Sequence, residues 1–127
     1  MKVRALVAKT DGVADANGHA LARGSVRPAQ NIPVTRNFDP RLPPIGRADI
    51  TVEGDDVFAD IEIDDPSHLH GLAPAIGGRG MIDIVAGGVR SSTTFDVYEL
   101  SMCDGANSDQ RIPRLHVNPS GQPARKA

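Results

Sequence analysis

Residues 45–64, IGRADITVEGDDVFADIEID, carry the clearest structural signal in this chain. Apolar side chains stand at every second position in residues 48–52 and again in residues 57–63, mostly with polar or charged side chains between them. A polar turn at Glu53–Asp56, which contains a glycine, separates the two runs. Because successive side chains of a strand point to opposite faces, this stretch predicts a β-hairpin with one apolar face.

Shorter runs with similar alternation predict further strands on both sides of the hairpin. The predicted strands are Lys2–Lys9, Ala20–Arg27, Ile32–Asn37, Ala75–Ala86 and Thr94–Met102, with an irregular loop at Phe38–Pro44 and a connection containing Gly87-Gly88 and Ser91-Ser92. Asp65 as N-cap and Pro66 at the first helical position predict a short helix over Pro66–Leu72. We therefore expect a small all-β barrel, closed or partly open, with at most one short helix.

The composition limits the domain organisation and the function classes. The 127 residues suit one domain, which we place at residues 1–112, and the Pro- and Gly-containing residues 113–127 predict an extended C-terminal tail. Only 3% of the residues are aromatic and the net charge is −2, which argues against nucleic acid as a partner. The sequence has no apolar run that suits a membrane, and the lone Cys103 excludes a multi-cysteine zinc site. We expect no cofactor and no metal.

Three segments, taken in order, resemble a known enzyme family. They are NIPVTRNFDPRLPPIGRADITVEGDDVFADIEI (residues 31–63), LAPAIGGRG (residues 72–80) and VYELSMCDGANSDQRI (residues 97–112). Together they resemble the prohead proteases, the capsid-maturation proteases of tailed bacteriophages. Members of that family carry an Asn-His-Asp motif, then Ser-Ile-Gly-Phe, and later a Glu-Val-Ser-Leu segment. In this sequence Phe38 stands at the matching histidine position and Ala75 at the matching serine position.

The resemblance implies a protease-like fold in a virion context, and the two replacements predict a chain that is not an enzyme. Serine-type catalysis needs a hydroxyl and a base that takes its proton, and neither phenylalanine nor alanine supplies one. We expect a minor capsid or decoration protein, made in the bacterial host cytoplasm and bound to the outer surface of the capsid. Its expected partners are the major capsid protein and other copies of itself. The expected contact residues are Phe38, Arg41, Leu42, Arg114, Leu115, His116 and Val117.

Other interpretations remain open at this point. An active or residual protease could use Ser91 or Ser92 with His68 or His70 as its base, and an internal capsid assembly factor would need no catalysis. The two histidines, two positions apart, could hold a metal on a strand, although surface histidines are the simpler interpretation. The glycines of Gly77–Gly80 lack the residues of a phosphate-binding loop and favour a bulge or a close backbone approach.

Charge is distributed unevenly along the chain. Asp60, Glu62 and Asp64 alternate along one predicted strand and therefore share a face. From residue 111 onward the chain contains only basic charges, at Arg111, Arg114, Arg125 and Lys126. Exposed ion pairs are weak singly, so these charges would steer and align adjacent copies or a shell more than they would add affinity.

Overall fold

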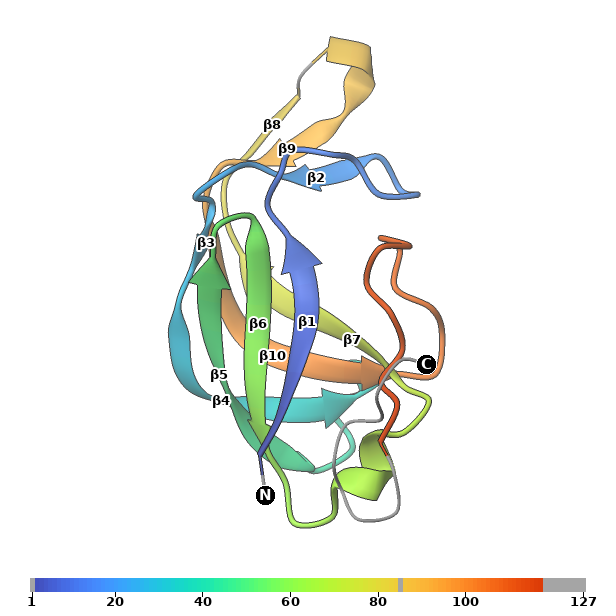
Figure 1. The fold of residues 1–127 in the computed structure, drawn as a ribbon. Coiled ribbons are helices and arrows are strands. Elements are labelled where there is room, and N and C mark those ends of the chain that lie inside the picture. Colours follow the sequence, from blue (N-terminus) through green and yellow to red (C-terminus); the bar gives the residue numbers. More distant parts are fainter. Residues whose placement is uncertain (1, 85, 118–127) are drawn as a thin grey trace.

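The computed structural model describes residues 2–84 and 86–117, and it is a β-structure built around one large sheet (Figure 1). The strands are β1 (Lys2–Lys9), β2 (His19–Leu21), β3 (Val26–Arg27), β4 (Ala29–Arg36), β5 (Gly46–Glu53), β6 (Asp56–Glu62), β7 (Ala73–Arg79), β8 (Ile82–Ile84), β9 (Arg90–Ser92) and β10 (Phe95–Cys103). Two short 3-10 turns, η1 (Pro66–Leu69) and η2 (Ala86–Gly88), complete it. The prediction of an all-β chain is confirmed.

The hairpin predicted from residues 45–64 forms as β5 and β6, which pair antiparallel with Arg47 opposite Glu62 and Glu53 opposite Asp56. Gly54 occupies the turn with φ +60°, a backbone conformation that favours glycine. β1 pairs antiparallel with the outer edge of β6, so that the first strand of the chain extends the hairpin to three antiparallel strands.

The predicted helix forms only as the single 3-10 turn η1, at the bottom of the molecule in Figure 1. The Asp65 side chain accepts a hydrogen bond from the Ser67 amide, and Pro66 stands in the first turn, as the capping signals predicted. The turn ends at His70, whose extended backbone leads the chain toward β7.

The order of strands in the main sheet is β1-β6-β5-β4-β10-β3, with β7 on the other edge of β10. β10 therefore pairs with three strands, antiparallel with β7 and parallel with β4 and β3. β1 and β7 come close to each other. Within the described residues no ladder of hydrogen bonds joins those two strands, and no closed barrel is found.

Residues predicted as one strand from Ala75 to Ala86 form two strands in different sheets. β7 ends at Arg79 and β8 begins at Ile82. At Gly80 the backbone passes so close to Thr94 that a Cβ would collide with its carbonyl oxygen, and here the chain leaves the main sheet. The prediction of a continuous strand is therefore wrong, because the glycine marks a crossing of backbones and not a position within a strand.

A small second sheet, β2-β9-β8, projects from the top of the molecule in Figure 1. β9 pairs parallel with β2 and antiparallel with β8. Ser91 and Ser92, expected in a connecting loop, lie in β9, and Gly87 and Gly88 form the preceding turn with positive φ angles. The expected strand Ala20–Arg27 is divided into β2 and β3 by a turn.

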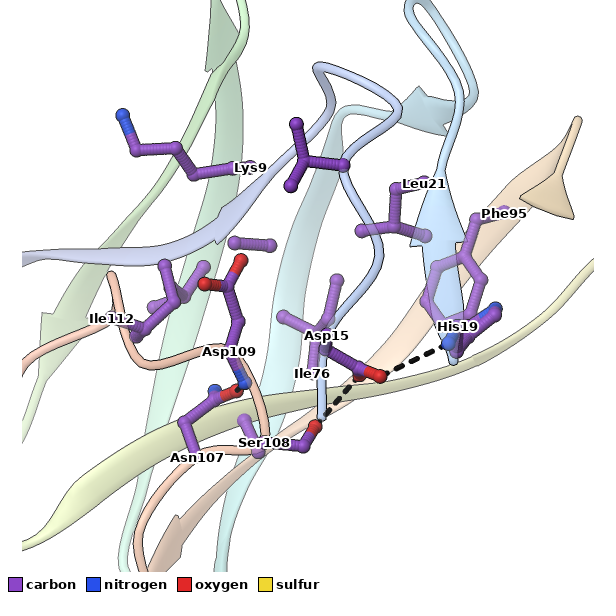
Figure 2. A pocket seen from close by; sticks show the side chains of 14 residues that line it. Lys9, Asp15, His19, Leu21, Ile76, Phe95, Asn107, Ser108, Asp109 and Ile112 are labelled. Atoms are coloured by element: carbon purple, nitrogen blue, oxygen red, sulfur yellow. Dashed lines mark hydrogen bonds between the residues drawn. The ribbon is translucent and has the colours of Figure 1, made fainter. Parts of the chain in front are cut away.

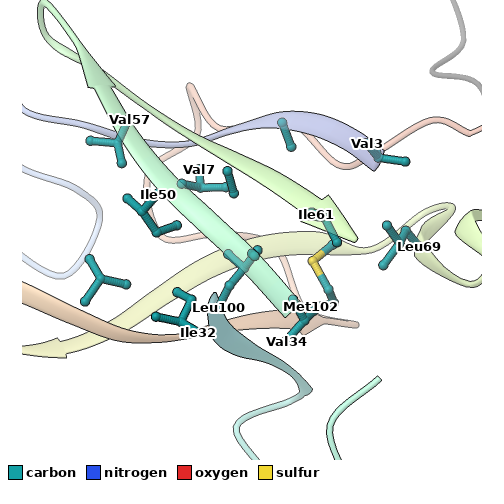
Figure 3. Close-up of a cluster of buried hydrophobic side chains, with 14 of the residues drawn as sticks. Val3, Val7, Ile32, Val34, Ile50, Val57, Ile61, Leu69, Leu100 and Met102 are labelled. Atoms are coloured by element: carbon teal, nitrogen blue, oxygen red, sulfur yellow. The ribbon is translucent and has the colours of Figure 1, made fainter. Parts of the chain in front are cut away.

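One hydrophobic core lies inside the curved main sheet (Figure 3). Its fully buried large side chains come from both ends of the sequence and from the long strands of the sheet. They include Val3, Val7, Val34, Ile50, Val57, Ile61, Leu69, Leu100 and Met102. Because the chain has few aromatic residues, this core consists of interlocking aliphatic side chains.

Candidate functional site

The most unusual backbone of the main sheet lies just after β4. Asn37 and Phe38 both have φ of 51°, and the Asp39 amide donates to the Arg36 carbonyl at 2.9 Å, which together resemble a type I′ turn. Asparagine tolerates this left-handed region, whereas a bulky phenylalanine rarely enters it. The Asn37 side chain holds the turn in place through Asp104, accepting from its amide at 2.9 Å and donating to its carboxylate at 3.0 Å.

The turn folds Phe38 back across β10 and onto β7. The Phe38 amide donates to Ser101 Oγ at 2.8 Å, and Ser101 is aligned with Ala75 in the β7–β10 ladder. A Cβ at Gly77 would lie 2.9 Å from Phe38 Cε1, so the aromatic ring lies directly over that glycine. The structure thus places the Phe38 ring over β7 at Gly77, two residues along the strand from Ala75.

The side chains at this meeting point do not form a serine–base pair. The Ser101 hydroxyl is fully buried and accepts the Phe38 amide, while Glu99 accepts the Thr35 hydroxyl at 2.8 Å. The described histidines have their contacts elsewhere: His19 with Ser92, His68 with Asp65, and His70 with both Val117 and His116. Among the described residues, no histidine therefore bonds to a serine at this point.

The loop that follows Phe38 is exposed and stiffened by local contacts. The side chains of Phe38 and Leu42 are 42% and 47% exposed. Arg41 forms two hydrogen bonds with the Asp39 carboxylate, which together with the Arg41 amide lower the pKa of Asp39 below its usual value. The loop therefore presents apolar side chains on a backbone that is already ordered.

Sequence reasoning missed one neighbour of this surface, Tyr98. It is the extra residue in a β-bulge of β10 opposite Gly77 and Gly78, and its side chain is 51% exposed. The alternation of apolar and polar side chains along β10 does not indicate the bulge. The only signal in the sequence that could have drawn attention to Tyr98 is that it is the single tyrosine. Two of the four aromatic side chains thus stand exposed around one pair of glycines.

The predicted contact residues near the C-terminus divide into two kinds. Leu115 and Val117 pack onto the core of their own domain, and Val117 is only 6% exposed. Arg114 and His116 remain on the surface, where Arg114 donates to the carbonyl oxygens of Gly71 and Asp104. Residues 113–117 of the expected tail therefore lie against the domain, and residues 118–127 lie outside the described residues.

The displaced-nucleophile interpretation does not match the geometry. Ser92 Oγ lies 2.7 Å from His19 Nε2, whereas His68 and His70 belong to the η1 end, at the opposite end of the molecule (Figure 1). Ser92 is 1% exposed, so its hydroxyl cannot meet a substrate. This serine and His19 join β9 to β2 across the small sheet.

The two histidines considered as metal ligands have separate partners. His68 lies 3.4 Å from the Asp65 carboxylate, and the His70 ring accepts the Val117 amide. Within residues 2–84 and 86–117 no group of three or more histidine, cysteine, aspartate or glutamate side chains is placed to hold a metal.

Some side chains of the acidic face and of the basic C-terminal residues form ion pairs with other residues of the same chain. Asp60 lies 3.7 Å from the Arg4 guanidinium on the neighbouring strand. Arg111 bridges Asp11 and Asp109, and its hydrogen bonds lower the pKa of both carboxyls. Arg125 and Lys126 lie outside the described residues.

A cavity of about 150 Å³ lies between the ends of β1 and β7, beneath the loops of residues 11–18 and 104–112 (Figure 2). Its wall includes Ala75 and combines apolar residues, among them Val7, Ile76 and Phe95, with polar ones, among them Lys9, Asp15 and His19. Asp15 accepts the His19 amide at 3.0 Å and the Ser108 hydroxyl at 2.8 Å. Burial raises the pKa of Asp15, but these hydrogen bonds outweigh it and the pKa lies below its usual value.

The cavity is stabilised by the Asp15 carboxylate, which links the loop of residues 15–19 to Ser108. It borders the same position, Ala75, that the Phe38 turn approaches from β10.

Comparison of the chain with protein-family models, curated proteins and solved structures finds no match. Among the described residues, no helix has the length and apolar character needed to cross a membrane.

Proposed function

We propose that this chain is a non-catalytic structural protein of a tailed-bacteriophage virion, a minor capsid or decoration protein on a partly open barrel like that of the prohead proteases. The observation that carries the proposal is the meeting of the Phe38 turn with Ala75–Gly78. The resemblance assigns a histidine and a serine to Phe38 and Ala75, and a catalytic pair must converge in space.

The chemistry of the two replacements supports loss of catalysis. An aromatic ring at position 38 adds contact area while it removes the base, and a methyl group at position 75 removes the nucleophile. The left-handed backbone of Phe38 costs free energy, of the order of 1 kcal/mol. A strained, half-exposed aromatic residue is more typical of a binding surface than of a core position.

The proposed contact surface consists of Phe38, Arg41, Leu42 and Tyr98, and we name it the Phe38 surface. Its exposed aromatic and aliphatic side chains with one arginine fit the composition of protein interfaces. The proposed partner is the major capsid protein on the outer face of the shell, with other copies of this chain as neighbours. Repetition by capsid symmetry would multiply a contact that is small in a single copy.

Quantitative mass spectrometry of purified particles that carry this gene tests the proposal. A fixed ratio of this chain to the major capsid protein is expected. Trace amounts in particles whose capsid subunits have trimmed N-termini would overturn the proposal and favour a protease or an internal assembly factor. Labelling of any serine of the purified chain by a fluorophosphonate probe would identify the protease.

A further inference from the structure

The last described residues, Ile112–Val117, form a strap that closes over the connection between η1 and β7. The Leu115 amide donates to the Leu72 carbonyl, and the Gly71 amide donates to the Leu115 carbonyl, both at 2.8 Å. The side chains of Leu115 and Val117 pack on the hydrophobic core. The strap is thus held by a few backbone hydrogen bonds and two apolar side chains.

The last hydrogen bond of the strap is accepted by a histidine ring. The Val117 amide donates to His70 Nδ1 at 3.0 Å. Because a backbone amide can only donate, Nδ1 must be without a proton, and the ring must be the neutral tautomer that carries its proton on Nε2. His70 is the C-cap residue of η1, and its amide bonds to the Ser67 carbonyl, so the position of the ring is set by the turn.

We propose that His70 is a proton-operated latch for the C-terminal strap. A proton on Nδ1 replaces the acceptor with a donor that faces the Val117 amide, and the bond cannot form. The bond is therefore present when the imidazole is neutral and is lost when Nδ1 is protonated. Opening of the strap uncovers the apolar surface beneath Leu115 and Val117.

The groups around the latch favour release on protonation. The His116 ring makes an edge contact with His70 at 5.7 Å, and the Arg114 guanidinium bonds to the carbonyl of the adjacent Gly71. A protonated His70 would therefore stand beside one permanent cation and one titratable ring. The nearby carboxylates have other partners, since Asp65 pairs with His68 and Asp104 pairs with Arg36.

Linkage gives the size of the effect. If only the open strap accepts the proton, the open fraction rises by at most about tenfold for each pH unit of acidification.

Amide hydrogen exchange of the full chain, followed by NMR at pH 7.5 and pH 5.5 and corrected for intrinsic exchange rates, tests the latch. The protection factor of the Val117 amide is expected to fall about tenfold at the lower pH. His70→Asn places an oxygen acceptor near the position of Nδ1 without a titrating ring, so this variant should keep the same protection at both pH values. His70→Ala should show low protection at both. His116→Asn is the matched control and should keep most of the wild-type response.

An unchanged Val117 protection factor in the wild type would overturn the latch. A tenfold fall that persists in His70→Asn would also overturn it, because another group would then be responsible. The core amides of β5 and β6 report global unfolding in the same spectra and must stay protected throughout.

Discussion

The β5–β6 hairpin and the Phe38 turn with its neighbours β7 and β10 follow two different kinds of physical rule. In the hairpin, antiparallel pairing is regular, and every second side chain enters the core. Around Phe38 the pairing is partly parallel, β10 contains a bulge, and two non-glycine residues have left-handed backbones. The first region is organised to be stable, and the second departs from regularity where it presents exposed aromatic side chains. Such departures usually mark sites that serve a function.

The largest effect is expected in the regular region. Ile61→Ala removes a fully buried side chain from the middle of the hairpin and should lower the free energy of unfolding by about 3–4 kcal/mol, measured by urea denaturation. Ile82→Ala, at an exposed position of the small sheet, is the matched control and should change it by less than about 0.5 kcal/mol. Equal effects at the two positions would mean that the described core is wrong.

The next effect probes the close approach of β7 to β10. Gly78→Ala would place a methyl group 2.6 Å from Phe95 Cε1 and against the Asp96 carbonyl, so we expect a loss of about 2–3 kcal/mol in the free energy of unfolding. Gly105→Ala, where a Cβ meets nothing within 4 Å, should be nearly neutral. A neutral Gly78→Ala would show that β7 and β10 are not as close as described.

A smaller effect isolates the strain at Phe38. Phe38→Gly and Phe38→Ala both remove the ring, but only glycine enters the left-handed region without cost. The glycine variant should therefore be the more stable of the two by about 1 kcal/mol, again in urea denaturation. If the alanine variant is as stable as the glycine variant, the backbone at this position is not left-handed. The Phe38 turn would then differ less from the regular hairpin than described.

The smallest effect concerns the loops that lie outside both regions. Arg111 lowers the pKa of Asp11 and of Asp109, so the stabilisation is present above the ordinary aspartate range and is lost as the pH falls below about 4. Arg111→Met should reduce the stability at pH 6 by about 0.5 kcal/mol and leave it little changed near pH 2.5. Arg41→Met removes only a local pair and should show less pH dependence, because that pair can persist in the unfolded chain. The reverse order would contradict the described bridge between the loops.

The sequence predicted those features that short-range patterns control. Period-two alternation predicted the hairpin, and Asp65 with Pro66 predicted the turn η1. The break at Gly80 was missed, because a glycine near the end of an alternating run does not reveal which distant carbonyl approaches it. The docking of Leu115 and Val117 was missed for a similar reason, since neighbouring prolines favour a free tail while the apolar surface that binds these side chains comes from elsewhere in the chain.

The candidate site shows the same limit. The identities of Phe38 and Ala75 could be read from the sequence, and so could the absence of a base and a nucleophile at those positions. The left-handed turn, the bulge at Tyr98 and the contact of Phe38 with Gly77 depend on strand pairing across the sheet. The hydrogen bond between His19 and Ser92 joins residues far apart in the chain, and no local pattern indicates it.

Site-specific photo-crosslinking in assembled particles tests most directly whether the Phe38 surface binds the capsid. A photoreactive amino acid replaces Leu42, 47% exposed on this surface, and in a separate variant replaces Val13, which is 55% exposed in the loop between β1 and β2. The account predicts an adduct with the major capsid protein from position 42 and none from position 13. An adduct from position 13 alone, or no capsid adduct from either position, would contradict it.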